Sequence, residues 1–224
     1  MPGYSQSVNS LVLPGVYAPQ DDTELLAGVL SEESFGPGTR VLDVGTGSGA
    51  LALAAARRGA EVTAVDVSWR AVWTTRVNAW LAGLAVRIRH GNLFGPVRGR
   101  SFDLILANPP YVPAPDSRWR AHHSSRAWDA GRDGRLVLDR ICRDAPALLR
   151  PGGVLLVVHS ALSDPGRTLE RLRAAGLKAA VVRRRWIAFG PVLRARQGWL
   201  RDRGLLDAAD EREELVVIRA ERPL

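Results

Sequence analysis

A chain of 224 residues, 46% hydrophobic and 24% charged, has the length of one domain and the composition of a folded globular protein, which excludes a fibrous or disordered one. A single cysteine, Cys142, excludes an internal disulfide and a cysteine-based zinc site. The net charge of +8 comes almost wholly from arginines spread along the chain, with Lys178 as the single lysine. We therefore interpret it as a solvated basic surface rather than a nucleic-acid patch.

The sequence carries no targeting or membrane signal. No basic cluster followed by an apolar run opens it, and no stretch approaches the roughly 18 apolar residues that a membrane helix needs. We therefore predict a cytoplasmic protein without a membrane partner.

From residue 40 onward, short β-branched apolar runs alternate with amphipathic segments, a pattern typical of strand–helix units in a parallel sheet. We predict an α/β fold in a single domain, with a doubly wound, mostly parallel sheet of seven strands. Strands are expected at 40–44, 61–66, 86–89, 102–107, 154–159, 179–184 and 214–219. Helices are expected at 48–58, 69–82, 135–149 and 166–175, with a Pro-Gly-Gly turn at 151–153 that ends the third.

Two segments depart from this alternation. Residues 109–133 form a loop of a length more typical of a lid or binding loop than of a connector. Residues 187–210 form an insertion before the last strand, and its apolar positions Val192, Leu193 and Leu200 have helical spacing.

Residues 41–50 read VLDVGTGSGA, a strand that runs into a glycine turn and then a helix. Gly45, Gly47 and Gly49 allow a ligand to approach the backbone, and the helix N-terminus offers unpaired N–H groups. The spacing also satisfies the dinucleotide pattern G-x-G-x-x-G/A. Asp43 favours a different cofactor, because a carboxylate there pairs with an ammonium group and repels a pyrophosphate. Its alternative role is to stabilise the turn or cap the helix.

Two further pairs follow predicted strands. Asp66 ends the second strand, where α/β nucleotide-binding proteins hold ribose hydroxyls with an acid, and Val67 is placed to cover an adenine ring. The alternative for Asp66 is a solvated carboxylate. Asn92 and Leu93 follow the third strand and are expected at the other edge of the adenine.

Asn108-Pro109-Pro110-Tyr111 directly follows the apolar strand 102–107. The two prolines fix φ and lack N–H groups, so the turn presents carbonyl oxygens without competing donors. The Asn108 side-chain oxygen and the Pro109 carbonyl are therefore expected to accept both hydrogens of a planar NH2 group, on which Tyr111 stacks. Since the lone pair of such a nitrogen is delocalised, orientation and charge stabilisation, rather than a strong base, would carry the catalysis.

With these motifs the chain resembles the HemK/PrmC-like class I methyltransferases, which use S-adenosylmethionine to N-methylate protein glutamine. Residues 15–26 resemble the opening segment of the family's short eukaryotic and archaeal branch, which lacks the helical N-terminal domain. Residues 128–135 resemble that branch's signature after the substrate loop. The resemblance implies a Rossmann-like methyltransferase domain at 39–224 and a cofactor-capping segment at 1–38.

The resemblance also implies roles for individual residues. Contacts to the cofactor are expected from Thr23, Asp43, Gly45, Asp66, Asn92, Leu93 and Asn108, and the catalytic set is Asn108, Pro109 and Tyr111. We expect the substrate to lie against Pro110, Tyr111 and Trp128. Asn92 stands where the family usually has an acid, and Ala130 replaces a usual glycine, so adenine contacts and substrate are expected to differ.

The remaining candidates are aromatic residues and histidines. Trp69, Trp73 and Trp80 share one helical face and are predicted to pack in the core, with Trp69 alternatively at the adenine edge. In the long loop, Trp119 and Trp128 are predicted to contact the substrate or to anchor the loop. The loop histidines, His122 and His123, have no partners at metal-ligand spacing, so we predict no metal site.

We therefore predict an S-adenosylmethionine-dependent methyltransferase that acts on a glutamine side-chain amide in a protein, of the release-factor type. The enzymatic alternatives are methylation of the adenine exocyclic amine in DNA or RNA, which usually requires base flipping and a further recognition surface, and methylation of a small metabolite. A dehydrogenase ranks last. From another class, the chain is a cofactor-binding scaffold or the activated half of a heterodimer, since the short branch relies on a small partner protein.

Overall fold

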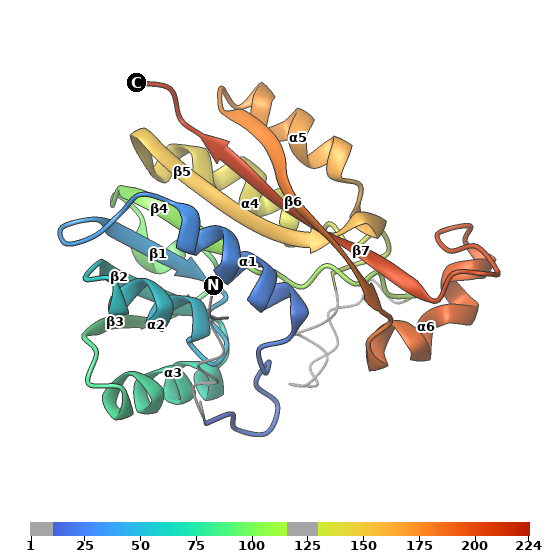
Figure 1. Cartoon of the computed structure of the whole chain (residues 1–224), viewed down its shortest axis with the longest axis horizontal. Helices are drawn as coiled ribbons and strands as arrows, with labels where there is room; N and C mark the ends of the chain where they lie inside the picture. The colour runs from blue at the N-terminus through green and yellow to red at the C-terminus, as the bar shows by residue number, and fades with distance from the viewer. Residues whose placement is uncertain (1–10, 116–129) are drawn as a thin grey trace, which may run out of the picture.

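The computed structural model describes residues 11–115 and 130–224. Seven strands form one sheet in the order β3-β2-β1-β4-β5-β7-β6 (Figure 1). The strands are β1 (Arg40–Val44), β2 (Glu61–Asp66), β3 (Val86–His90), β4 (Phe102–Ala107), β5 (Leu149–Ser160), β6 (Lys178–Ala188) and β7 (Arg212–Glu221). The first five pair in parallel, and β7 runs antiparallel between β5 and β6. The predicted doubly wound, mostly parallel fold is confirmed.

Helices cover both faces of the sheet (Figure 1). On one face, α1 (Asp21–Glu32) and α2 (Ala50–Arg57) pack against alternate strand residues such as Leu106 and Val217. On the other, α4 (Leu138–Asp144) and α5 (Pro165–Ala174) pack against Ile105 and Val157. These strand side chains are fully buried, and each contributes roughly 1.5–3 kcal/mol by leaving water. Within the described residues, short 3-10 helices join the elements at Gly95–Val97, Ala145–Leu148 and Ala161–Ser163.

The order of the strands determines where a ligand can bind. From β1 the chain proceeds outward through β2 to β3, and it then returns to place β4 on the other side of β1. The loops that follow β1 and β4 therefore diverge at the carboxyl end of the sheet. Such a reversal opens a crevice, which is the usual ligand site of doubly wound folds.

The predicted packing of the three tryptophans is wrong. Trp69, Trp73 and Trp80 lie on the outer face of α3 (Trp69–Leu81) and are 58%, 56% and 78% exposed. The buried face of this helix carries small and polar residues instead, including Thr75 and Asn78. Thr75 donates its hydroxyl hydrogen to the Gly47 carbonyl, and the Asn78 amide donates to the carbonyls of Leu11 and Ser48. Helical spacing identified the shared face but not the face that is buried.

The Pro-Gly-Gly turn is also placed differently. Residues 151–153 lie inside β5, which begins at Leu149, and the preceding helix already ends at Asp144. Gly152 donates to the carbonyl of Arg222, and the N–H of Arg222 donates to Gly153, both at 2.8 Å. The segment therefore continues the pairing with the C-terminal chain, where the register between β4 and β5 also shifts. Long-range pairing accommodates these glycines within a strand.

The predicted insertion has a core of its own. Its first two residues complete β6, and the helical spacing corresponds to α6 (Pro191–Asp202). Phe189, Leu193 and Leu200 form a small buried cluster with Val112, close to Tyr111. The Arg196 guanidinium donates to the carbonyl of Pro113 at 3.1 Å. The insertion is therefore packed on the chain that follows the predicted catalytic motif.

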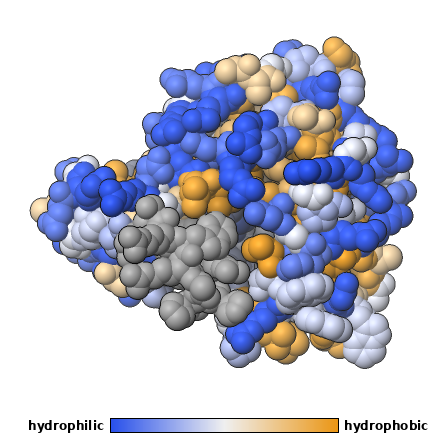
Figure 2. Space-filling model, turned by 180° about the vertical axis from the view of Figure 1, so that it is seen from behind, coloured by the Kyte–Doolittle hydropathy of each residue, from blue (hydrophilic) through white to orange (hydrophobic). Residues whose placement is uncertain are grey.

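The surface seen from behind is mostly hydrophilic, with hydrophobic residues in small separate areas (Figure 2). In the two ranges that the structure describes, no helix is both long and apolar enough to cross a bilayer.

Candidate active site

A cavity of about 730 Å³ opens at the carboxyl ends of β1 to β4, a volume typical of pockets for small molecules and cofactors. Its walls come from the segment before α1, the glycine turn, the ends of β2, β3 and β4, and the starts of α6 and β7. Most predicted site residues line it together: Thr23, Gly45, Gly47, Asp66, Val67, Asn92, Leu93, Asn108, Pro109, Pro110 and Tyr111.

The glycine turn holds one wall of the cavity close to β2. Gly45 donates its N–H to the carbonyl of Val65 at 2.8 Å, and Gly47 donates to Asp66 Oδ2 at 3.0 Å. Both glycines have positive φ, +75° and +56°, a conformation that L side chains rarely adopt. The turn therefore presents backbone rather than side chains to the cavity.

Two residues of the same motif, Asp43 and Gly49, do not line the cavity. A Cβ at Gly49 would lie 2.8 Å from Thr75 Cγ2, so this glycine allows α3 to pack closely against the turn. Asp43 is buried and accepts hydrogen bonds from the Thr46 hydroxyl at 2.6 Å and the Ala52 N–H at 3.1 Å. Burial raises the pKa of Asp43 to about 6. Neither residue lines the cavity, and the contacts of Asp43 are those of a turn-stabilising carboxylate; its role toward the cofactor stays a prediction.

Asp66 lies in the cavity wall and is positioned by main-chain donors. The N–H of Ser68 donates to its Oδ1 at 2.8 Å, while Gly47 donates to Oδ2. Burial raises its pKa. Next to it, the His90 ring lies 2.9 Å from the Val67 carbonyl and stacks on Trp69, with ring centroids 4.0 Å apart. Trp69 also lines the cavity, and its alternative role at the adenine edge stays a prediction.

The predicted catalytic motif meets the start of α1. The Asn108 amide Nδ2 donates to the Thr23 hydroxyl oxygen at 3.2 Å. The Thr23 hydroxyl and N–H both donate to Asp22 Oδ1. Thr23 is therefore engaged within the protein, where it orients Asn108; its contact with the cofactor stays a prediction.

Sequence reasoning missed Asp22, which joins three segments of the site. Its Oδ2 accepts hydrogen bonds from the Tyr17 hydroxyl at 2.6 Å and the Tyr111 hydroxyl at 3.0 Å. Burial, with the Asp22 charge as the next cause, raises the pKa of both tyrosines, so they act as neutral O–H donors. An acid five residues after a tyrosine was the available signal, but the sequence does not show that the two side chains meet in the folded chain. The hydroxyl of Tyr111 is thus directed at Asp22.

Glu213 is the second residue that sequence reasoning missed. It lies at the start of β7, is 6% exposed and lines the cavity. Burial raises its pKa to about 7. Its strand was predicted to begin one residue later, at 214, and the sequence contained no motif around it.

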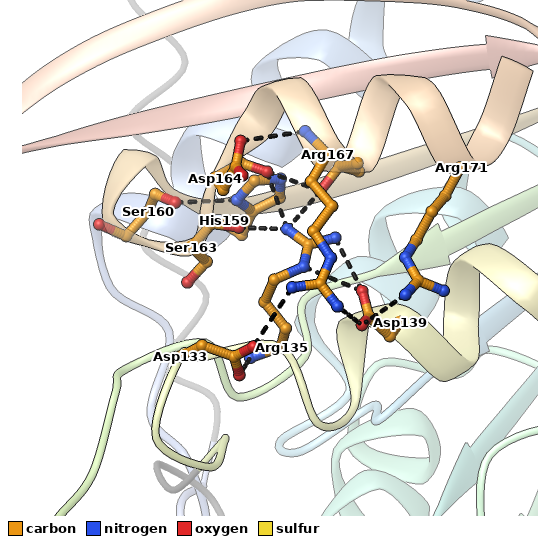
Figure 3. A network of polar contacts seen from close by, with 10 residues as sticks. Asp133, Arg135, Asp139, His159, Ser160, Ser163, Asp164, Arg167 and Arg171 are labelled. Atoms are coloured by element: carbon orange, nitrogen blue, oxygen red, sulfur yellow. Dashed lines mark hydrogen bonds and ion pairs between the residues drawn. The ribbon is translucent and has the colours of Figure 1, made fainter.

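Figure 3 shows a polar network around the buried Arg135, and its member Ser163 connects it to the motif. Ser163 donates its hydroxyl hydrogen to the Tyr111 carbonyl at 2.7 Å. The Arg135 guanidinium in turn donates to the carbonyls of Ser163 and Asp164 and, through Nε, to Asp139 at 2.9 Å. Arg135 comes from the predicted signature 128–135 and is 2% exposed. The signature therefore holds the main chain of Tyr111 indirectly.

The structure leaves part of the long loop undescribed. Trp119, His122, His123 and Trp128 lie outside the described residues, so their predicted roles stay predictions. Within the described ranges, no group of three or more His, Cys, Asp or Glu side chains is arranged to hold a metal ion.

Comparisons with known proteins find relatives that are named as methyltransferases. A protein of Methanocaldococcus jannaschii, named as a putative protein N5-glutamine methyltransferase, is 33% identical over 79% of this chain and 88% of its own length. A release factor glutamine methyltransferase of Deinococcus radiodurans is 42% identical over 73% of this chain. The chain spans only 60% of that bacterial relative.

Among solved structures, the E. cuniculi Mtq2–Trm112 complex, described as responsible for methylation of the translation termination factor eRF1, matches the fold with a TM-score of 0.67. The match covers 93% of this chain and 99% of that chain, at 23% identity. The family described as the methyltransferase small domain matches residues 8–124. The predicted class, an S-adenosylmethionine-dependent methyltransferase, is thereby confirmed. The chain belongs to the methyltransferase small domain family.

Proposed function

We propose that this chain transfers a methyl group from S-adenosylmethionine to the side-chain amide nitrogen of a glutamine in a protein, with a peptide-chain release factor as the acceptor. The names of the relatives support this acceptor. The observation that carries the proposal is the bond from Asn108 Nδ2 to Thr23. Because the amide nitrogen serves as a donor within the protein, the amide oxygen serves as an acceptor for a substrate N–H, beside the Pro109 carbonyl.

The cavity residues fit the cofactor. A carboxylate at the end of β2, Asp66, is suited to ribose hydroxyls, and it is held rigidly by two main-chain donors. Val67 and Leu93 supply apolar side chains for the two sides of an adenine ring, with Asn92 at its edge. When bound there, S-adenosylmethionine supplies an electrophilic methyl group on a positively charged sulfur.

The motif residues orient the acceptor nitrogen. Asn108 Oδ1 and the Pro109 carbonyl accept the two N–H hydrogens, which aligns the nitrogen and increases its electron density. Partial positive charge develops on the nitrogen as it gains the methyl group, and these two oxygens stabilise it. The nitrogen then gives up one hydrogen as a proton to water. Tyr111 and Pro110 form the wall against which the amide plane lies.

We assign the acceptor to the end of the cavity near β7 and α6. Val112, Ile187 and Leu193 line that end, and the predicted insertion is packed there. The segment before α1 covers the cavity with Val16 and Tyr17. These positions support a capping role for the described segment before α1 and a place for the predicted insertion, 187–210, beside the acceptor.

We further propose a small activating partner protein on the outer face of α3. Trp73, Trp80 and Leu81 are 56%, 78% and 63% exposed there, an unusual apolar surface for a helix beside the sheet-edge strand β3. The complexed state of the structural neighbour supports such a partner. The surrounding arginines, including Arg76 over the Trp73 ring, favour acidic side chains on the partner.

We place both proteins in the cytoplasm, where the buried free thiol of Cys142 stays reduced.

The acceptor class is tested with tritiated S-adenosylmethionine and cell lysate, divided between nuclease and protease treatment. We expect macromolecular label that survives nuclease and is removed by protease, and peptide mapping should then place the methyl group on a glutamine. Label that survives only protease would instead identify a nucleic-acid base. Asn108→Ala serves as the negative control, with an expected loss of roughly 100-fold or more in rate.

A further inference from the structure

Glu213 is a polar group of the cavity that the proposed mechanism leaves unused. The residue is 6% exposed, and its Oε2 atom is buried without a hydrogen-bond partner among the described residues. Buried polar atoms in native proteins are nearly always hydrogen-bonded, and an unpaired one is costly. Because the residue itself lines the cavity, a ligand bound there can supply a partner for its carboxyl group.

The position of Glu213 indicates that the methyl acceptor, rather than the cofactor, supplies this partner. In the β6–β7 ladder Glu213 lies opposite Ile187, and both line the cavity with the start of α6. The glycine turn and Asp66 belong to β1 and β2, separated from β7 by β4 and β5 in the sheet. Glu213 is therefore at the end of the cavity away from the cofactor wall.

The groups around Glu213 are either carboxylates or hydroxyls that already donate a hydrogen bond to a carboxylate. Asp21 and Asp22 face it from α1, and the hydroxyls of Tyr17 and Tyr111 both donate to Asp22. A hydrogen bond from Ser160 favours the ionised form, but burial is the largest effect and raises the pKa of Glu213 to about 7. From β6, Arg185 approaches Asp21 and Glu24 of α1, both at 3.8 Å. Near neutral pH Glu213 is thus partly a neutral carboxylic acid, with an O–H to donate.

A primary amide has two N–H donors and one carbonyl acceptor. Asn108 and Pro109 supply acceptors for the two N–H groups, so the amide carbonyl requires a donor. We propose that the carboxyl group of Glu213 donates a hydrogen bond to the carbonyl oxygen of the acceptor amide and so selects an amide over an amine. This inference rests on the proposed function, since it concerns the orientation of the glutamine acceptor. Glu213 binds and orients the amide; it does not increase the reactivity of the nitrogen.

Acceptor binding should therefore depend on pH. Below pH 7 Glu213 is protonated and donates to the carbonyl oxygen, whereas above pH 7 its negative charge repels that oxygen. We expect the KM for a glutamine-containing release factor to rise roughly fivefold between pH 6 and pH 8.5, with a smaller change in kcat. In Glu213→Gln an amide NH2 replaces the acid as a donor at all pH values, so the KM should stay near the low value of the unaltered chain throughout. Glu213→Ala should have the high KM throughout.

The experiment measures KM and kcat from pH 6 to 8.5 for the unaltered chain, Glu213→Gln, Glu213→Ala and the control Glu211→Gln, which changes an exposed glutamate two residues away. Calorimetric binding of the same release factor provides a readout that does not depend on turnover. A pH-dependent KM that persists in Glu213→Gln, or Glu213→Gln and Glu213→Ala that behave alike, would overturn the inference while the proposed function stands. Release factor that is not methylated by the unaltered chain even in cell lysate, which supplies the proposed activating partner, would overturn both.

Discussion

The Tyr111 hydroxyl donates a hydrogen bond to Asp22 Oδ2 at 3.0 Å, between residues 89 positions apart. This bond joins the end of β4 to the start of α1, and the Asn108–Thr23 bond runs beside it. The two ends of the catalytic motif are thus both anchored on one helix. The start of α1 is therefore part of the acceptor site rather than a cover placed over it.

Tyr111→Phe tests this anchor. The phenylalanine keeps the ring but loses the hydroxyl bond to Asp22, so the ring orientation is less restricted. We expect the KM for the acceptor to rise roughly fivefold and the free energy of unfolding to fall by about 1 kcal/mol. Steady-state kinetics measure the KM, and urea unfolding measures the free energy. The affinity for the cofactor should change less than twofold. A cofactor affinity that falls as much as acceptor binding would contradict the assignment of Tyr111 to the acceptor.

Arg135→Met tests the buried network behind the motif (Figure 3). The substitution leaves the carbonyls of Ser163 and Asp164 without their donor, while Asp139 keeps its ion pairs with two other arginines. We expect the free energy of unfolding to fall by about 3 kcal/mol. The control is Arg171→Met, since Arg171 is 44% exposed and contacts the same aspartate, and its effect should stay within about 0.5 kcal/mol. Equal losses in the two variants would show that the network does not act through Arg135.

Gly49→Ala tests the packing of α3 on the glycine turn. At Gly49 φ is +88°, and an added Cβ would lie 2.8 Å from Thr75 Cγ2. We expect a loss of about 2 kcal/mol in the free energy of unfolding. Gly99→Ala, with φ of +74° and open space around the added Cβ, measures the backbone cost alone. Adding Thr75→Ser should recover the difference, because serine lacks Cγ2 but keeps the hydroxyl that bonds to Gly47. No recovery would mean that the clash is relieved elsewhere.

Asp43→Asn tests the buried carboxylate. Burial raises the pKa of Asp43 to about 6, above its value of 3.8 in the unfolded chain, so the folded state binds the proton more tightly. The contribution of Asp43 to stability therefore falls as pH rises from about 4 to 6 and stays low above that. The asparagine does not titrate, and its oxygen can accept from Thr46 and Ala52. Relative to the unaltered chain, the variant should gain about 1–3 kcal/mol between pH 4 and pH 7, measured by denaturant unfolding. A constant difference across this range would show that Asp43 stays ionised.

Local sequence determined three of the strands and the two motifs. β1, β2 and β4 begin and end at the predicted residues, because each is a short apolar run bounded by glycine, proline or polar residues. The glycine turn and the Asn-Pro-Pro-Tyr segment were recognisable for the same reason: their conformations depend on glycine and proline, whose backbone preferences act within a few residues.

Tertiary structure alone decided which polar and aromatic side chains are buried. The polar face of α3 is buried because Thr75 and Asn78 bond to the glycine turn and the opening segment, and the tryptophans consequently face outward. Asp22 and Glu213 enter the site because strand order brings the start of α1 and the start of β7 to one cavity. Local sequence does not predict these contacts, since the burial and hydrogen bonding of a polar group depend on partners that are distant along the chain.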